Sequence, residues 1–277
     1  MLRNAPLSTL TRFGTGGPAD ILATPGSTAE LSLLLKNNAV EPITIIGAGS
    51  NILVPDDGLR GLVIHTGGLR GIRLDNGVLV AECGAPMIAI ADFAAANGVP
   101  GFEFMIGIPG TIGGGLRANA GCFGGAISDN LISVRGFNYD GVEIEADAGQ
   151  CGLTYRGSAL PPDFIVSEVL LAADRTDDET SIRARMADII AKKNAAQPMD
   201  ARTAGSTFKN PLDAPAWKKI KDAFPNGLTV GGARISEKHA NFIVADGACT
   251  SSDILELIKQ IQEKTGLELE IKILGTI

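Results

Sequence analysis

Apolar residues along this chain form short runs that predict a protein with many short β-strands. Ile43–Ile46 is an apolar, β-branched run, and Phe164–Ala173 is a longer apolar segment of β-prone residues. Asn76-Gly77 and Asp140-Gly141 each separate two further runs and are typical of tight hairpin turns. Strands are also expected over residues 62–65, 71–74, 78–83, 131–138, 142–145, 242–245 and 267–274.

Helical patterns are fewer, and most begin at clear signals. Ser27–Glu30 has the spacing of a capping box and precedes leucines that repeat on one helical face. Pro86 opens a helix over Met87–Ala96, which Asn97-Gly98 closes. Two more helices are expected over 179–196 and 252–264. Because few helices separate the strands and no fixed repeat is visible, the pattern favours an α+β fold over a doubly wound sheet.

Composition and charge exclude several classes of function. The chain has 277 residues, 45% of them hydrophobic, and a formal net charge of -7, so its overall field repels nucleic acids and anionic membranes. The four cysteines are scattered without a C-x-x-C pair and there are two histidines, which argues against a zinc site and a disulfide framework. No signal peptide or membrane-spanning run is visible. We therefore expect a soluble protein of a reducing compartment.

The glycine-rich tract Gly107–Gly125 is the most unusual stretch of the chain. Glycine adds no side chain to a core, but it lets the backbone turn at positive φ and lets another body approach closely. One interpretation is an irregular loop, and the other is a cradle whose backbone N–H groups bind the phosphates of a cofactor. Gly47–Asn51 has the same two interpretations. A Rossmann fingerprint is excluded there, because its third glycine and following helix are missing.

Gln197-Pro198 ends the helix predicted over 179–196 and marks a domain boundary, beyond which the local charge changes sign. Residues 199–240 hold seven basic and four acidic side chains, a local net charge of +3 in an acidic chain. Some of the lysines in Lys218–Lys221 are expected on a solvated helix face. The local excess of positive charge also fits the patch that an anionic substrate requires.

Seven short segments carry a resemblance that extends over nearly the whole chain. They are residues 12–20 (RFGTGGPAD), 46–53 (IGAGSNIL), 107–124 (GIPGTIGGGLRANAGCFG), 155–158 (YRGS), 204–211 (AGSTFKNP), 236–244 (SEKHANFIV) and 267–275 (LELEIKILG). Together, and in this order, they resemble the UDP-N-acetylenolpyruvoylglucosamine reductases, the MurB family. The short interval between Arg156 and Ser206 is similar to the compact second type of that family.

The resemblance implies an α+β fold whose FAD-binding part is of the vanillyl-alcohol-oxidase (PCMH) type. Two FAD-binding subdomains would span residues 1–58 and 59–197, and a C-terminal α+β substrate-binding domain would span 198–265. The last strand, within 266–277, would return to the second FAD-binding subdomain.

The resemblance also implies a reaction. NADPH would reduce non-covalently bound FAD, and the enolpyruvyl ether of UDP-N-acetylglucosamine would then be reduced to UDP-N-acetylmuramate in the cytoplasm, as a step of peptidoglycan precursor synthesis. The expected partner is a small-molecule UDP-sugar, with no metal, nucleic acid or membrane insertion, and the expected state is a monomer. Two alternatives remain: another flavin oxidoreductase of the same fold, or a flavin- or nucleotide-sugar-binding module without turnover.

Three residues match the catalytic positions of the family. Ser206 matches the proton donor, and a weakly acidic hydroxyl suits a strongly basic enolic carbon. Arg156 matches the arginine that polarises the substrate carboxylate, a role suited to a permanently charged planar fork. Alternation in the last predicted strand puts Glu268 and Glu270 on one face, and the family motif selects Glu270. Without the resemblance, these would be a turn residue, a surface arginine and an edge-strand charge.

Further residues match ligand-binding positions of the family. Residues expected to contact the UDP-sugar are Tyr155, Lys209, Asn210 and Lys238. Residues expected to contact FAD are Gly47, Gly49, Ser50, Asn51, Gly110, Thr111, Gly113, Asn119 and Gly121. Cys122 lies among the latter in the sequence, and we expect a small buried thiol there rather than a covalent link to the flavin.

Overall fold

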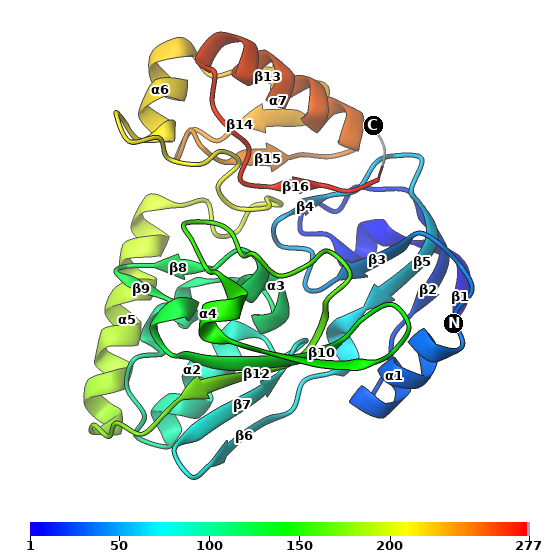
Figure 1. Cartoon of the computed structure of the whole chain (residues 1–277). Helices are drawn as coiled ribbons and strands as arrows, with labels where there is room; N and C mark the ends of the chain where they lie inside the picture. The colour runs from blue at the N-terminus through cyan, green and yellow to red at the C-terminus, as the bar shows by residue number, and fades with distance from the viewer. Residues whose placement is uncertain (276–277) are drawn as a thin grey trace. The chain divides into compact units, whose positions relative to one another are not determined.

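The computed structural model describes residues 1–275 (Figure 1). The chain divides into two compact units. Unit 1 comprises Met1–Leu22, Gly49–Val63 and Lys193–Ile277, and unit 2 comprises Ala23–Ala48 and Ile64–Lys192. Unit 1 therefore gathers three separate stretches of the chain. The last two residues of the expected returning strand, 276 and 277, lie outside the described residues.

The N-terminal part of unit 1 is built from short strands. β1 (Leu2–Pro6) and β2 (Pro18–Ala23) are antiparallel, with the 3-10 helix η1 (Leu7–Leu10) between them in the sequence, and β5 (Leu59–His65) lies next to β2. β4 (Ile52–Leu53) pairs in parallel with β16 (Lys272–Ile273). This pair joins the last strand to a strand within residues 1–58, the first expected FAD-binding subdomain, and not to a strand of the second (59–197) as expected.

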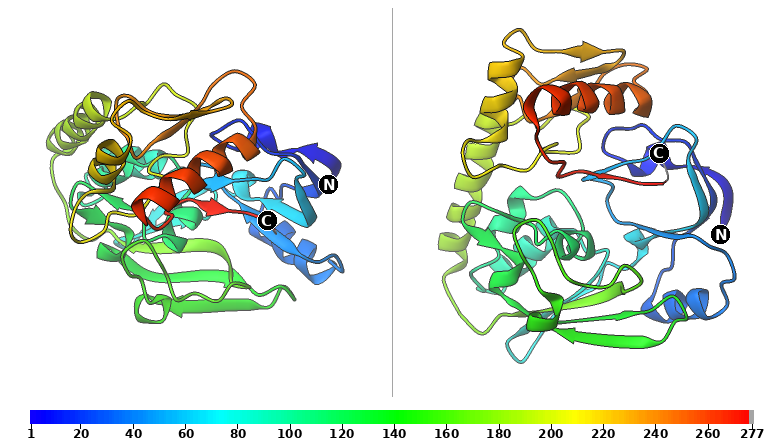
Figure 2. Two further views of the ribbon diagram at one scale, coloured as in Figure 1. Left: turned by 90° about the horizontal axis from the view of Figure 1, so that it is seen from above. Right: turned by 45° about the horizontal axis from the view of Figure 1, so that its top comes forward.

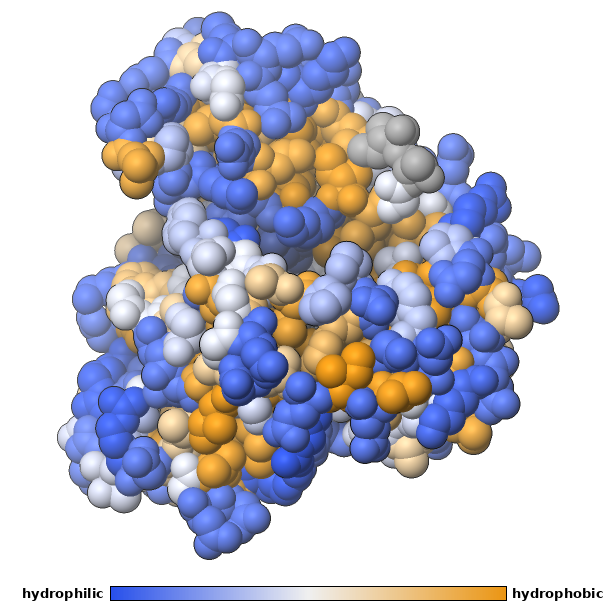
Figure 3. All heavy atoms as spheres, viewed as in Figure 1, coloured by the Kyte–Doolittle hydropathy of each residue, from blue (hydrophilic) through white to orange (hydrophobic). Residues whose placement is uncertain are grey.

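The C-terminal part of unit 1 is a small α+β arrangement. β13 (Thr229–Val230), β14 (Ala233–Ile235) and β15 (Ile243–Ala245) form an antiparallel sheet in sequence order. α7 (Ser251–Thr265) packs against β13 and β14 and against α6 (Ala216–Ala223) (Figures 1 and 2). Apolar residues of α7 recur at helical spacing and are buried, whereas its outer surface is hydrophilic (Figure 3).

The centre of unit 2 is an antiparallel sheet in the strand order β11-β10-β12-β7-β6. Its strands are β6 (Ile72–Asp75), β7 (Val78–Glu82), β10 (Leu131–Phe137), β11 (Glu143–Asp147) and β12 (Ile165–Ala172). α3 (Ile112–Arg117) packs on β7 and β12, and α4 (Ala148–Cys151) packs on β10 and β11.

Unit 2 also contains helices and short strands that are not part of this sheet. The helices are α1 (Thr28–Lys36), α2 (Met87–Ala96) and α5 (Glu179–Ala196), whose last residues belong to unit 1. The 3-10 helices are η2 (Thr66–Gly68), η3 (Glu103–Gly107) and η4 (Ile127–Asp129). The short strands are β3 (Ile43–Ile46), β8 (Gly121–Cys122) and β9 (Gly125–Ala126), of which the last two form a hairpin.

Local signals in the sequence located most of these elements correctly. Ser27 caps α1, and its Oγ accepts a hydrogen bond from the Glu30 amide at 3.1 Å. α2 and α5 have the expected bounds. Asn76 and Gly77 both have positive φ (48° and 78°), as the tight turn between β6 and β7 requires.

Two expectations fail. The glycine tract contains α3, which the sequence did not predict, and glycines let this helix pack closely: a Cβ on Gly113 would lie 2.9 Å from the Cys83 carbonyl oxygen. The strand expected over 267–274 is wrong in extent, because only Lys272–Ile273 forms a strand. Residues before it are held by an isolated bridge between Phe208 and Leu269.

Asp56 holds the loop after β4 against the start of α7. Its carboxylate accepts hydrogen bonds from the Ser251 amide (2.8 Å), the Ser252 amide (2.9 Å) and the Ser252 hydroxyl (2.6 Å). Burial by itself would raise the pKa of this carboxyl, but these hydrogen bonds outweigh burial and lower the pKa below its ordinary 3.8. A negative charge is also favoured at a helix N-terminus.

We expect Asp56→Asn to lower the thermal midpoint at neutral pH and to lose this effect in acid. Because the folded-state pKa is depressed, ionised Asp56 stabilises the fold above pH 3.8, and the contribution is lost as pH falls through the folded-state value. Circular dichroism melts over a pH series would compare the variant with wild type and with Asp57→Asn, its exposed neighbour. A difference that stays constant into acid would contradict this role.

Among the described residues, no helix combines the length and the apolar composition that crossing a lipid bilayer requires.

Candidate active site

Ser206 lies in an extended segment of unit 1 that is held from both sides. Gly205, at φ +82°, turns the chain into this segment. On one side Ser206 forms an antiparallel bridge with Phe242. On the other side the Thr207 carbonyl accepts from the Glu270 amide at 2.9 Å, and the Lys209 amide donates to the Glu268 carbonyl at 2.9 Å. This register places two predicted catalytic residues, Ser206 and Glu270, on adjacent extended segments, because Glu270 bonds to the residue that follows Ser206.

Asn241 fixes this segment, and sequence reasoning assigned it no role. The Thr207 amide donates to the Asn241 carbonyl at 2.8 Å, and the Phe208 amide donates to Asn241 Oδ1 at 3.0 Å. Asn241 Nδ2 in turn donates to the Phe208 carbonyl at 2.8 Å, and the side chain is only 3% exposed. A buried amide needs partners of this kind. The signal for it was a lone asparagine at the start of a predicted apolar strand.

Replacement of Asn241 with alanine is expected to destabilise the chain by about 2–4 kcal/mol, because the Phe208 amide and carbonyl would be left buried without partners. Looser placement of Ser206 should also lower turnover in the molecules that remain folded. Urea unfolding and steady-state kinetics would measure the two effects. Asn37→Ala, which removes an exposed asparagine at the end of α1, is the matched control and should change stability by less than about 0.5 kcal/mol.

Other predicted residues of unit 1 lie near the same segment. Asn51 Nδ2 donates to the Glu270 carbonyl at 3.3 Å, so a predicted FAD residue contacts a predicted catalytic residue. Lys209 Nζ lies 3.3 Å from Glu268 Oε2. This lysine therefore forms an ion pair with Glu268, whose side chain is 79% exposed. Asn210 Oδ1 accepts from the Ala216 amide at 3.0 Å and so holds the first residue of α6.

Residues Gly47–Ser50 form a turn with unused backbone donors. Within the described part of the chain, none of their four consecutive amides has a hydrogen-bond acceptor. Position 49 requires glycine, because its φ is +61° and an added Cβ would lie 1.9 Å from the Leu10 carbonyl oxygen. Consecutive free amides in a turn form a concavity that binds anionic oxygens. The turn therefore fits the pyrophosphate of FAD.

The glycine tract of unit 2 offers fewer donors than the sequence suggested. Backbone amides from Ile112 to Ala120 bond within the protein, many of them inside α3 or to residues beside it. Gly110 and Thr111, just before α3, have amides without an acceptor among the described residues. A Cβ on Gly47 would lie 2.4 Å from Thr111 Oγ1, so glycine at that position lets the two turns meet. Gly110 and Thr111 remain the better candidates for contact with FAD.

Arg156 stands in a tight turn with a strained backbone. Thr154 and Gly157 exchange backbone hydrogen bonds (3.0 and 3.3 Å), which leaves Tyr155 and Arg156 at the two central positions. Arg156 has φ +58°, which is rare for a residue with a side chain and marks stored strain. Its guanidinium lies 5.1 Å from the centre of the Tyr155 ring, and its Nη2 donates to the Gly121 carbonyl at 3.2 Å. The predicted residues Tyr155, Arg156 and Gly121 are therefore in contact.

Asn119 connects the same region through its side chain. Its Nδ2 donates to the Thr154 carbonyl at 3.1 Å and to Ser128 Oγ at 3.3 Å, and its Oδ1 accepts from the Ser128 amide at 3.1 Å. Asn119 therefore holds the turn that carries Arg156. This structural role uses the amide that was expected to contact FAD.

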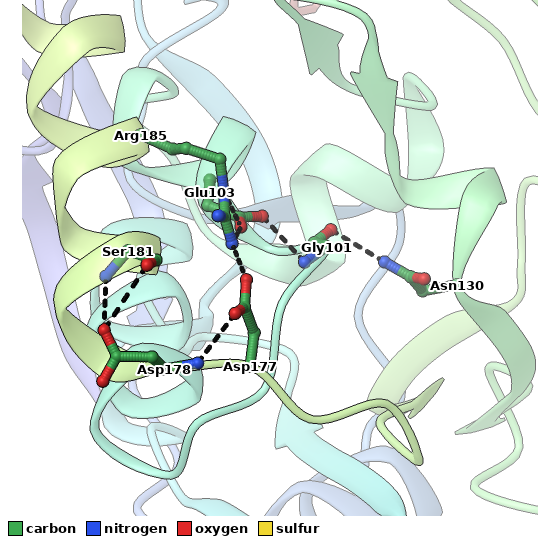
Figure 4. A network of polar contacts seen from close by, with 7 residues as sticks. All are labelled: Gly101, Glu103, Asn130, Asp177, Asp178, Ser181 and Arg185. Atoms are coloured by element: carbon green, nitrogen blue, oxygen red, sulfur yellow. Dashed lines mark hydrogen bonds and ion pairs between the residues drawn. The ribbon is translucent and has the colours of Figure 1, made fainter.

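The hairpin β8–β9, which contains Gly121, rests on η3. Cys122 Sγ lies 3.2 Å from the Phe104 carbonyl oxygen, and a Cβ on Gly125 would lie 2.6 Å from the Phe104 ring. A network of polar contacts fixes η3 at its start (Figure 4). In it Glu103 accepts from the Gly101 amide at 2.7 Å and from Arg185 Nε at 2.9 Å. The position of Gly121 thus depends, through η3, on the contact between Glu103 and Arg185 of α5.

A pocket of about 680 Å³ lies in the C-terminal part of unit 1. Its walls are the end of α5, one face of α6, the loop 224–227 and the turn 235–240. The predicted substrate residue Lys238 lines it and donates from Nζ to the Asn194 carbonyl at 2.5 Å. His239 also lines the pocket, and burial lowers its pKa below the ordinary 6.5, so the imidazole is neutral at neutral pH.

Comparison with known proteins decides the family. A model of the FAD binding domain matches residues 19–147, and a model of the UDP-N-acetylenolpyruvoylglucosamine reductase C-terminal domain matches 197–274. The reductase of Azorhizobium caulinodans is 39% identical over 280 residues, which cover 98% of this chain and 91% of that protein. That of Acidiphilium cryptum is 41% identical over 280 residues, which cover 98% and 90%.

The chain belongs to the MurB family. A crystal structure of MurB from Thermus caldophilus has a TM-score of 0.87 to this chain at 34% identity, and the match covers 97% of each. These matches confirm the resemblance read from seven motifs and the expected α+β fold with an FAD-binding domain. Within each unit, the MurB motifs bring predicted residues together: Ser206, Glu270 and Asn51 in one, and Gly121, Tyr155 and Arg156 in the other.

Proposed function

We propose that this chain catalyses the reaction of the MurB family, the reduction of UDP-N-acetylglucosamine enolpyruvate to UDP-N-acetylmuramate with NADPH as the donor. The observation that carries the proposal is a family match over nearly the full chain. Arg156, Ser206 and Glu270, which resemble the catalytic positions of the family's motifs in the sequence, support it. A binding module without turnover would have no need of all three.

FAD fits the residues available for it. The free amides of Gly47–Ser50 are donors for its pyrophosphate, and those of Gly110 and Thr111 are further donors. When bound, FAD supplies the transfer of hydride from NADPH to the vinyl group of the substrate. The chain itself must then hold the charge that develops on the substrate, deliver a proton and exclude water.

Each of these tasks has a proposed residue. Ser206 Oγ donates its proton to the substrate carbon next to the ether oxygen, where negative charge collects. The guanidinium of Arg156 binds the substrate carboxylate, into which that charge is delocalised, and stays protonated throughout. Glu270 orients the substrate or helps to polarise its enol ether. Tyr155, Lys209 and Asn210 are proposed to contact the UDP-sugar.

We also propose that the pocket lined by Lys238 receives the nucleotide end of the substrate. Its volume of about 680 Å³ is within the range of sites for small ligands.

The proposal includes a cytoplasmic location, because NADPH and nucleotide sugars are metabolites of the cytoplasm. It also includes a monomeric state. Size-exclusion chromatography with light scattering would test the oligomeric state, and a mass of one 277-residue chain is the expected result.

An anaerobic absorbance titration tests the proposed reaction. Purified protein should be yellow, NADPH should bleach it, and UDP-N-acetylglucosamine enolpyruvate should rapidly restore the oxidised spectrum. A protein that bleaches but ignores this substrate would support a different flavin oxidoreductase. A colourless protein that does not take up added FAD would support a module without turnover.

A further inference from the structure

The single tryptophan of this chain stands where its ring is available to a ligand. Trp217 lies in the first turn of α6 and is 45% exposed, whereas Ala216 and Ile220 on the same helix are fully buried. The indole is therefore not part of the core that fixes α6. It lines the pocket instead, together with Lys221 and Phe224. A half-exposed tryptophan on the wall of a pocket is typical of a binding surface.

Trp217 and Lys221 share one face of α6, because residues four apart lie above one another on a helix. Phe224 follows at the end of the helix, and the turn 235–240, with Ser236, Lys238 and His239, provides other lining residues. The pocket thus combines aromatic rings with two lysines. Stacking surfaces and cations together are the chemistry that recognises a nucleotide.

Among the three rings in the pocket, Trp217 is the one without a partner of its own. Lys264 Nζ lies 4.7 Å from the centre of the Phe224 ring, and the His239 ring packs edge-on against Phe242 at 4.9 Å. Within the described residues, no ring and no cation contacts the Trp217 indole in this way. Its aromatic surface is therefore the one that remains for stacking.

The two lysines of the pocket, Lys221 and Lys238, differ from the other lysines of α6 in the groups that they contact. Lys218 and Lys219 of α6 pair with Asp222 and Asp213, each at 2.7 Å. Lys221 instead donates to the Pro225 carbonyl at 3.0 Å, as Lys238 does to the Asn194 carbonyl. In the described chain neither pocket lysine pairs with a carboxylate, although Glu237 also lines the pocket. Their positive charge is available to a diphosphate.

We infer that Trp217 binds the nucleobase of a nucleoside diphosphate by stacking, with Lys221 and Lys238 on the diphosphate. The inference rests on the proposed function, in which this ligand is the uridine diphosphate end of the substrate. Trp217 would then determine affinity for the substrate without taking part in the chemistry.

Fluorescence of the holoenzyme tests the inference directly, because Trp217 is the only tryptophan. UDP should quench and shift its emission in a saturable way, and inorganic pyrophosphate, which lacks a base, should not. Equal responses to UDP and pyrophosphate, or no response to UDP, would overturn the stacking role. Quenching by UDP in a protein that fails to turn over the enolpyruvyl substrate would support this inference while refuting the proposed function.

Kinetics of variants provide an independent test. Trp217→Leu should raise KM for the enolpyruvyl substrate roughly 5- to 100-fold with kcat nearly unchanged, as expected for loss of uniform binding. Trp217→Phe keeps an aromatic face and should restore most of the affinity. Lys218→Met, on the same helix but outside the pocket lining, is the control. If wild type is active and Trp217→Leu raises KM no more than Lys218→Met, the inference is wrong. Melting curves would establish that the variants are folded.

Discussion

Ser206→Ala is expected to accept hydride from NADPH as wild type does and to reduce the enolpyruvyl substrate about 10²- to 10⁴-fold more slowly. This range is the usual contribution of a positioned proton donor. Ser206 is half-buried, and its neighbour Thr207 bonds through backbone groups to the Asn241 carbonyl and the Glu270 amide. Removal of one hydroxyl leaves those bonds in place, so the loss should come from chemistry rather than from folding.

Rapid-mixing absorbance would separate the two half-reactions of Ser206→Ala. The bleaching rate with NADPH should match wild type, and the recovery rate with substrate should carry the whole loss. Ser206→Cys, which offers another proton donor of similar size, should recover part of the activity. Normal recovery in Ser206→Ala would remove Ser206 from the role of proton donor.

Arg156→Lys should lower kcat about 10²-fold, although it keeps the positive charge. A lysine presents a point charge and cannot reproduce the planar fork that pairs with a carboxylate. The strained backbone does not complicate the comparison, because both residues carry a Cβ and meet the same cost at φ +58°. The contact from Arg156 Nη2 to the Gly121 carbonyl would also be altered.

Steady-state kinetics with a surface control would measure this effect. Arg60 pairs with Asp20 through a side chain that is 78% exposed, and Arg60→Lys should leave turnover unchanged. Turnover of Arg156→Lys close to that of wild type would show that charge alone is sufficient and would contradict a role for the guanidinium geometry.

Local signals account for what the sequence predicted well. The Ser27 cap, the Asn76-Gly77 turn and the Gly98 end of α2 act over a few residues, so each could be located without knowledge of the rest of the fold. The Arg156 and Ser206 candidates came from motif positions of the MurB family. Their contacts within each unit could not be inferred from the sequence.

Features that depend on distant parts of the chain were missed for a physical reason. α3 forms in a stretch of poor helix propensity, because its glycines pack against Cys83 and Met87. Asn241 acquires its role only when Phe208, 33 residues away, lies beside it. Trp217 lines a pocket whose other walls include the end of α5 and the turn 235–240, both distant from it in the sequence. In each case tertiary contacts decide the outcome, and propensity and spacing do not record them.

The pairing of β16 with β4 has a consequence for synthesis of the protein. Lys272–Ile273 bonds to residues near position 52, and the Glu270 carbonyl accepts from Asn51. Glu270 is synthesised 219 residues after Asn51. The surroundings of Ser206 can therefore be completed only after residues 267–273 have been synthesised, and a chain truncated before them would carry the flavin-binding turns without the segment that holds Thr207 and Lys209.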